Sequence, residues 1–300
     1  MNKKQYRRLV EKAEELYFKG EYNDAEELYI EAFEYDIEVE HYVNYGFLLI
    51  EMEKLSEAEE VFTDLISLVR HPAVLFGLAL LKTEFGKPQE ALDLYEEIIK
   101  LKAQSHEAYK NAADLYDDLG ETAKAIEYYL KSVELGGDAF WPYTNIGAIY
   151  ESMDQNEKAL EYFLKAYEIK PNERIISYNL GVAYGKLKRY DEAIKYYLDD
   201  LNKVDHHEST YYNLGLAYKD AYQDYEKAKS YYLLGLKENE NNYFIWYNLG
   251  CVYALMEDYD NASDCFTYLK YKEPSIFASI ETDSELVEFR KTEQYQKIMG

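Results

Sequence analysis

A motif of about thirty-four residues recurs along most of the chain and constrains its fold more than any other feature. The motif is clearest in residues 178–197, YNLGVAYGKLKRYDEAIKYY. Leu180 and Tyr184 lie four residues apart, so they share one face of a first helix. Ala193 and Tyr197 have the same spacing in a second helix, and the polar residues between the two pairs predict a turn.

Three kinds of residue recur in register with this motif. The second-helix alanine is found at Ala25, Ala58, Ala91, Ala125, Ala159, Ala193, Ala228 and Ala262. Four residues after each alanine stands an aromatic residue: Tyr29, Phe62, Tyr95, Tyr129, Phe163, Tyr197, Tyr232 and Phe266. Twelve or thirteen residues before each alanine stands a small residue: Ala13, Gly46, Ala79, Ala113, Gly147, Gly181, Gly215 and Gly250. Because a glycine inside a helix costs about 1 kcal/mol relative to alanine, these small residues predict that a neighbouring helix packs closely against the first helix.

This period and these residues resemble the tetratricopeptide repeat (TPR) family. Residues 212–218, YNLGLAY, and 246–253, WYNLGCVY, are especially similar to its W-x-x-L-G-x-x-Y signature. The resemblance covers about residues 6–274 and implies an all-α fold, a right-handed α-solenoid of about eight antiparallel helix pairs (a TPR superhelix) with a C-terminal helical cap. We expect eight tandem units at about residues 6–38, 39–71, 72–105, 106–139, 140–173, 174–207, 208–242 and 243–274. The seventh unit has one extra residue near its turn, in residues 221–224.

Residues 275–300 depart from the repeat and are expected to form the capping helices. A terminal repeat needs a cover with a polar outer side, and we interpret this tail as that cover. Thr282 and Glu285 have the spacing of a capping box, and Thr292 is expected to cap a last short helix. A tail that docks on a partner is the alternative interpretation.

Composition narrows the classes of partner. The chain has 58 acidic and 33 basic residues, a formal net charge of −25, which disfavours nucleic acid and anionic membranes as partners. No apolar run approaches the length of a membrane span, and charged residues interrupt the N-terminal region where a signal peptide would need an apolar core.

Cys251 and Cys265 are expected to be buried, reduced thiols. A cytoplasmic protein fits these features, and the abundance of Tyr, Lys, Glu, Asn and Ile resembles the usage of an AT-rich bacterial genome.

The sequence contains no arrangement of residues that indicates catalysis. It has no P-loop, no G-x-G-x-x-G, no H-E-x-x-H and no cysteine pair at zinc spacing. The adjacent histidines His206 and His207 would not face one metal site from a helix. We therefore expect a protein that is not an enzyme and has no cofactor, metal or catalytic residues.

A series of asparagines indicates where a partner would bind. They stand two residues before the small residue of six units: Asn44, Asn111, Asn145, Asn179, Asn213 and Asn248. The resemblance implies that first helices line a concave groove, so these side chains would point into it. An amide carries both a donor and an acceptor, so a ladder of them can pair with the backbone of an extended peptide. The alternative is that asparagine is only part of the repeat consensus.

Other groove positions suggest the chemistry of the ligand. Aromatic residues that make good peptide anchors flank the asparagines, at Trp141, Tyr178, Tyr212, Phe244 and Tyr247. The fourth unit carries an acidic groove patch of Asp114, Asp117 and Asp118, which is either a solvated face or a site for a basic side chain. The second and third units have more apolar residues than packing between adjacent units requires. We call these extra residues the apolar patch: Val43, Phe47, Ile50, Phe76 and Leu80. This patch is either an exposed binding surface or deeper packing.

Together these features predict a non-enzymatic scaffold or adaptor that binds an extended peptide segment in its groove. The partner is expected to be a protein or peptide of neutral to basic character, with no nucleic acid and no membrane. Two alternatives stay open, a self-assembling structural repeat protein and a peptide-sensing regulator of a bacterial signalling pathway. The protein itself is expected to be a monomer or a homodimer.

Overall fold

The computed structural model describes residues 2–101 and 104–300, and this part of the chain contains helices and turns but no strands. The chain divides into two compact bodies, an N-terminal body that ends at Pro142 and a C-terminal body that begins at Tyr143. The division falls inside α9 (Phe140–Ser152). We describe each body by itself, and the unit boundaries proposed from the sequence stay a prediction.

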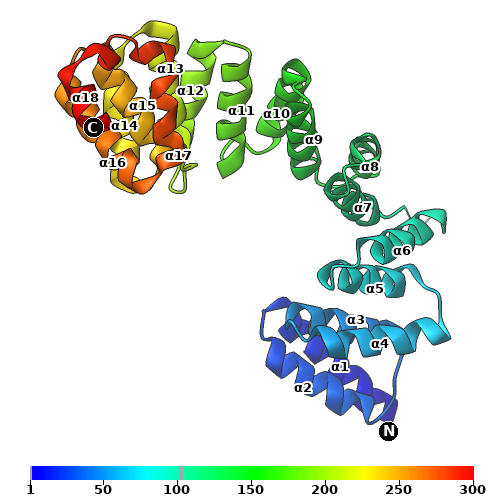
Figure 1. Cartoon of the computed structure of the whole chain (residues 1–300). Helices are drawn as coiled ribbons and strands as arrows, with labels where there is room; N and C mark the ends of the chain where they lie inside the picture. The colour runs from blue at the N-terminus through cyan, green and yellow to red at the C-terminus, as the bar shows by residue number, and fades with distance from the viewer. Residues whose placement is uncertain (1, 102–103) are drawn as a thin grey trace. The chain divides into compact units, whose positions relative to one another are not determined.

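Helices of twelve to seventeen residues follow one another in pairs through the described part of both bodies (Figure 1). In the N-terminal body they are α1 (Asn2–Phe18), α2 (Tyr22–Phe33), α3 (Val39–Glu51), α4 (Leu55–Leu68), α5 (Pro72–Glu84), α6 (Pro88–Lys100), α7 (His106–Asp118) and α8 (Thr122–Glu134). In the C-terminal body, after α9, they are α10 (Asn156–Ile169), α11 (Arg174–Lys186), α12 (Tyr190–Leu201), α13 (Thr210–Tyr222), α14 (Tyr225–Glu238), α15 (Tyr243–Leu255) and α16 (Tyr259–Lys272). The expected all-helical fold of paired helices is confirmed.

The turn inside each pair has one conformation throughout. A residue with positive φ stands five residues before each repeated alanine: Gly20, Glu53, Gly86, Gly120, Asp154, Lys188, Gln223 and Glu257. The next residue then donates its backbone N–H to a carbonyl five residues back, as Arg189 does to Tyr184 at 2.9 Å. In the seventh unit the same bond spans six residues, from Asp224 to Tyr218 at 3.0 Å. The extra residue predicted near this turn is therefore absorbed in the last turn of α13.

In the five units whose small residue is glycine, that residue lies against the aromatic ring of the second helix. A Cβ added at Gly181 would lie 2.5 Å from the ring of Tyr197, and one added at Gly215 would lie 2.2 Å from Tyr232. The same holds for Gly147 and Phe163, where the distance would be 2.5 Å. These distances are shorter than any normal carbon contact, so only glycine fits at these positions, as the sequence pattern predicted.

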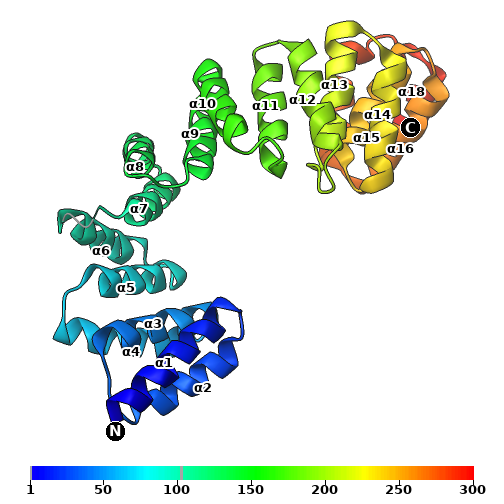
Figure 2. The same ribbon diagram turned by 180° about the vertical axis from the view of Figure 1, so that it is seen from behind.

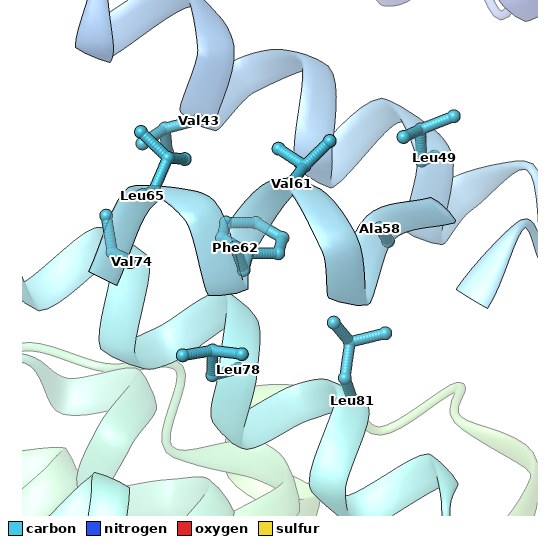
Figure 3. Close-up of a cluster of buried hydrophobic side chains, with 9 residues drawn as sticks. All are labelled: Val43, Leu49, Ala58, Val61, Phe62, Leu65, Val74, Leu78 and Leu81. Atoms are coloured by element: carbon cyan, nitrogen blue, oxygen red, sulfur yellow. The ribbon is translucent and has the colours of Figure 1, made fainter. Parts of the chain in front are cut away.

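Neighbouring pairs complete one another's core. Figure 3 shows side chains of α3, α4 and α5 converging on one another, with Phe62 of α4 among them. The ring of Phe62 contacts Gly46 of its own pair and also Gly77 of the next pair. This second contact explains why the third unit carries glycine where six other units carry asparagine. The first-helix members of consecutive pairs, such as α3 and α5 or α11 and α13, also contact each other, and we call the surface that they form within each body its A-helix face. Figure 2 shows α3 and α5 side by side in the N-terminal body.

The tail folds against the last pair as four short helices followed by α18 (Glu293–Met299). They are α17 (Pro274–Phe277), η1 (Ala278–Glu281), η2 (Ser284–Leu286) and η3 (Phe289–Lys291). Ile280, Leu286, Phe289 and Ile298 are buried in one cluster with residues of α15 and α16. Thr292 accepts a hydrogen bond from the Tyr295 N–H at 3.2 Å and caps α18 as predicted. The prediction that Thr282 is a cap was wrong, because Asp283 accepts the capping bond from the Glu285 N–H at 2.8 Å.

Two glycines of α11 give a matched test of the packing. Replacing Gly181 with alanine should lower the free energy of unfolding by about 1–3 kcal/mol, since the added methyl would overlap the Tyr197 ring. Gly185 lies on the same helix, and a Cβ there would meet only the Tyr197 hydroxyl at 3.5 Å, an ordinary contact. Gly185→Ala should therefore be neutral or stabilising by up to about 1 kcal/mol. Urea unfolding followed by circular dichroism measures both, and equal midpoints for the two variants would contradict the packing role.

Candidate functional site

The six asparagines lie on first helices and are half-buried, and most use their amide N–H groups within the protein. Asn44 donates to Glu14 Oε1 at 3.0 Å, and Asn111 donates to the hydroxyl of Tyr95 at 3.2 Å. Asn213 donates to the Tyr178 hydroxyl at 3.5 Å. Asn248 donates to the carbonyl of Phe244 at 3.0 Å. Three of these four bonds join consecutive units, so the asparagines have a structural role that the ladder hypothesis did not include.

The structure brings residues of three predicted classes together in the N-terminal body. A hollow of about 400 Å³ is lined by Phe76 and Leu80 of α5, Asn111 of α7, and Trp141 at the end of this body. Lys110, His106, Glu107, Ser132, Asp138 and Pro142 complete its wall. Trp141 is 47% exposed, so a large aromatic side chain remains open to solvent beside aliphatic neighbours. We call this feature the Trp141 hollow.

A second hollow adjoins the Trp141 hollow and extends the same apolar surface. It measures about 290 Å³ and is lined by Phe47, Phe76, Pro72 and Ile98, among other residues. Phe76 and Glu107 belong to both hollows. Phe47, Phe76 and Leu80 of the predicted apolar patch therefore line hollows on this body.

Two other members of the predicted apolar patch lie elsewhere. Val43 is only 7% exposed and packs with Phe62 and Leu65, so for this residue the deeper-packing interpretation of the apolar patch holds and the exposed-surface interpretation does not. Its position on α3 faces α4, and the core between the two helices covers it. Ile50 is half-buried and packs against the same cluster.

The predicted acidic groove patch is partly neutralised. Lys110 pairs with Asp114 at 2.6 Å, and the hydroxyl of Tyr129 donates to Asp114 at 2.7 Å. Burial, together with the charges of Asp118 and Asp114, raises the pKa of the Asp117 carboxyl above its ordinary value. Asp118 is exposed. Asp117 is therefore the member whose charge is held at a cost to the fold.

Most of the predicted aromatic anchors of the C-terminal body already contact other side chains of the protein. Tyr178 stacks on His207 with ring centroids 3.6 Å apart, and burial raises the pKa of its hydroxyl. The ring centroids of Tyr212 and Tyr232 lie 6.4 Å apart. Phe244 is 64% exposed and remains open to a partner.

Tyr247 shows that the tail takes the place of a further unit. Its hydroxyl donates to Asp283 Oδ2 at 2.6 Å. Tyr178 occupies the equivalent position one residue before its asparagine, and its hydroxyl meets Asn213, which lies thirty-five residues ahead. Asp283 lies thirty-six residues ahead of Tyr247, so a tail carboxylate stands where the next unit would place an amide.

Lys219 is a functional candidate that sequence reasoning missed. It is 8% exposed on α13, and its ammonium donates to both oxygens of Glu285 in the tail, at 2.9 and 2.8 Å. Asp220 lies 3.3 Å away. Burial lowers the pKa of Lys219, but the hydrogen bond with Glu285 and the charge of Asp220 raise it more, so the net pKa lies above the ordinary value.

A comparison of repeat positions could have found this lysine. It stands four residues after the small residue of its unit. The other units carry Tyr17, Ile50, Thr83, Asp117, Glu151, Gly185 and Ala254 at that position. A cation at one position out of eight, buried at the centre of a repeat, requires a carboxylate partner.

One group of side chains has the composition of a metal site but fits a metal poorly. Ligand atoms of Cys251, Asp283 and Glu285 lie within 4.8 Å of one another. The Lys219 ammonium already holds both Glu285 oxygens, which places a cation beside the cluster. Burial raises the pKa of the Cys251 thiol, which disfavours the thiolate that a metal needs. Both Cys251 and Cys265 are free and buried, as predicted.

Within the described residues, none of the helices combines the length and the apolar character needed to cross a bilayer.

The acidic patch makes a prediction about pH. Replacing Asp117 with asparagine should raise the melting temperature at about pH 7, because it removes a half-buried charge that Asp118 and Asp114 repel. A carboxyl with a raised folded-state pKa destabilises the fold above that pKa, and the loss is relieved as the pH falls and the group binds a proton. The gain should therefore shrink from about pH 7 to about pH 4. A gain that stays constant over this range in thermal melts would contradict the assignment.

Comparisons with known proteins agree with this architecture. Sequence profiles described as tetratricopeptide repeat match residues 76–140, residues 138–199, and residues 208–242 with 245–267. No curated protein matches the chain in sequence.

Several solved structures are similar in fold. The C-terminal part of a TPR repeat-containing protein from Cytophaga hutchinsonii is 19% identical with a TM-score of 0.67, and the match covers 83% of this chain and 100% of that one. The Pseudomonas aeruginosa pilF structure is 15% identical with a TM-score of 0.59, covering 69% and 94%. YrrB, described as a TPR protein with an unusual peptide-binding site, is 19% identical with a TM-score of 0.55, covering 61% and 95%. The profile matches and the shared architecture together show that the chain belongs to the tetratricopeptide repeat family, whose members are generally non-catalytic protein-interaction modules.

Proposed function

We propose that this protein is a cytoplasmic scaffold that binds an extended segment of a partner protein along its A-helix face. The Trp141 hollow carries the proposal. It combines an exposed indole, two apolar side chains and an amide in one concavity of the N-terminal body. A concave, mainly apolar surface with a few polar groups is the usual form of a binding pocket.

The side chains of the hollow suggest how a segment would bind. Phe76, Leu80 and Trp141 would surround one large apolar side chain, and burying such an anchor contributes most of the energy of many interfaces. Asn111 donates one amide N–H to the hydroxyl of Tyr95. Its side chain also has a second N–H donor and a carbonyl acceptor. These groups could pair with the backbone of the bound segment.

Charge favours a segment with neutral or basic residues beside the anchor. The carboxylate side chains Glu107 and Asp138 line the hollow. Lys110, the lysine in the wall, is already paired with Asp114. A basic residue next to the apolar anchor would therefore approach a carboxylate rather than a free ammonium.

Selection from a random peptide library displayed on phage tests the proposal without knowledge of the partner. The parent protein should enrich peptides that share an aromatic or large aliphatic residue. Trp141→Ala should weaken their binding by about thirtyfold, the effect of losing an interface residue of the most important kind. Fluorescence anisotropy with the enriched peptides measures the change.

Leu119 provides a matched control for this selection. It is 47% exposed, as Trp141 is, but it does not line the hollow. Leu119→Ala should bind the selected peptides with unchanged affinity. Equal loss in both variants, or no enrichment by a folded parent protein, would contradict the proposal.

Self-assembly is the alternative that the same surface allows. In that case light scattering would give a mass above 35.4 kDa that rises with concentration. The Trp141→Ala variant would return the mass to that of one chain.

A further inference from the structure

The C-terminal tail does more than cover the last helix pair. A cover for the end of a repeat array needs to contact only the last unit, here α15 and α16. Glu285 reaches beyond that unit to Lys219 on α13, sixty-six residues earlier in the chain. Asp283 meanwhile contacts Tyr247 on α15. The turn that carries these two carboxylates therefore lies across the A-helix face of the last two units.

The contacts of this turn are polar, and its apolar anchors lie on either side. Ile280 and Leu286 are fully buried in the cap cluster. Between them Glu281, Thr282, Ser284 and Glu285 are exposed, and only Asp283 is half-buried. Arg290 donates to the carbonyls of Ile280, before the turn, and Asp283, within it, at 2.8 and 2.7 Å. Because four of the five residues of the turn are exposed, we expect it to open locally while the buried anchors keep the cap folded, as weakly buried segments do.

We propose that Lys219 and Tyr247 form a carboxylate-binding subsite, that the tail occupies it as an internal ligand, and that an acidic segment of a partner protein with the pattern D-x-E replaces the tail there. This inference rests on the proposed function as a binder of extended segments. It concerns a different surface from the Trp141 hollow and deepens that function by giving the ligand chemistry of the C-terminal body.

Two observations fix the chemistry of the segment. Lys219 is almost completely buried, so lifting the turn would leave its ammonium with Asp220 as the remaining carboxylate within 4 Å among the described residues. Burying a charge without an adequate partner is strongly unfavourable, so the turn leaves readily only when another carboxylate arrives. The hydroxyl of Tyr247 is a second donor. It binds the carboxylate of Asp283, two residues before Glu285, whose carboxylate binds Lys219. An apolar or basic segment would not satisfy these two donors.

The repeat pattern supports exchange at this place. Asp283 stands where a further unit would place its asparagine, beside a tyrosine equivalent to Tyr178. The subsite is thus part of the A-helix face of the C-terminal body, along which Asn179, Asn213 and Asn248 also lie. The overall negative charge of the protein does not prevent binding of an acidic segment, because charges farther than about 8 Å are largely screened at physiological ionic strength.

The two cysteines report local opening and global unfolding separately. Cys251 lies under the turn, with its sulfur 3.9 Å from Asp283 Oδ2, whereas Cys265 is buried in the core with α14 and α15. Pulse alkylation of the full-length chain with iodoacetamide, followed by mass spectrometry, measures the two rates. Asp283→Asn combined with Glu285→Gln should raise the rate at Cys251 by about tenfold or more and leave Cys265 unchanged. Equal acceleration at both cysteines, or at neither, would overturn the internal-ligand interpretation.

Binding is measured by anisotropy with a fluorescein-labelled peptide, ETDSELVEF, the sequence of residues 281–289. The double variant Asp283→Asn, Glu285→Gln should bind it with saturation and at least about tenfold more tightly than the parent, whose own tail competes. Adding Lys219→Met should abolish this binding, and the peptide ETNSQLVEF should not bind. Failure of the double variant to bind ETDSELVEF while its Cys265 stays protected would refute the subsite.

Two further measurements separate this inference from its rivals. The double variant that also carries Trp141→Ala should bind ETDSELVEF with unchanged affinity. The experiment therefore distinguishes a wrong assignment of the peptide site at the Trp141 hollow from a wrong assignment of the subsite at Lys219 and Tyr247. A parent chain that forms a dimer lost on Lys219→Met would place the tail of a second copy in the subsite and overturn the assignment to a partner protein.

Discussion

The contact between a glycine of the first helix and an aromatic ring of the second helix, found in five units, is the interaction on which the rest of the structure depends. At Gly147, Gly181 and Gly215 the ring lies so close that no Cβ fits. Such a contact fixes the two helices of a pair at one separation and leaves the far side of the first helix uncovered. Neighbouring pairs cover part of it, as Phe62 does when it contacts both Gly46 and Gly77. What remains is the A-helix face, where the hollows and the tail are found.

The sequence predicts the fold so well because the same physical requirement recurs eight times. The alanines, the aromatic residues and the left-handed turn residues all keep one register, including the single added residue absorbed before Asp224. The binding surface was harder to predict. Position in the repeat indicates which side of a helix a residue occupies, but it does not indicate what lies over that side. For this reason the sequence left open whether Val43 belongs to an exposed surface or to deeper packing, and the structure places it in the core between α3 and α4.

The tail was predictable as a cap and not as an occupant of the A-helix face. It has no repeat from which register could be read, and its capping residue is Asp283 rather than the Thr282 that the capping-box spacing indicated. The pairing of Lys219 with Glu285 joins residues far apart in sequence, so no local pattern reveals it.

The asparagine series has a clear pattern in the sequence, but the pattern does not reveal what the asparagines do. Its regular spacing suggests a common function in binding, yet Asn44 and Asn111 already donate hydrogen bonds inside the protein. Regular spacing on a repeat surface therefore does not by itself distinguish a structural role from a binding role, and the hydrogen bonds of Asn44 and Asn111 show the structural one.

The central claim is that a partner segment places an apolar side chain beside Trp141. The chain has two tryptophans, so Trp246→Phe leaves Trp141 as the single indole reporter. The emission of this variant should shift to shorter wavelength when a peptide enriched by phage selection is added, because the half-exposed indole of Trp141 becomes buried. An unchanged emission spectrum under conditions where anisotropy shows the peptide to be bound would contradict the account and place the binding site elsewhere on the protein.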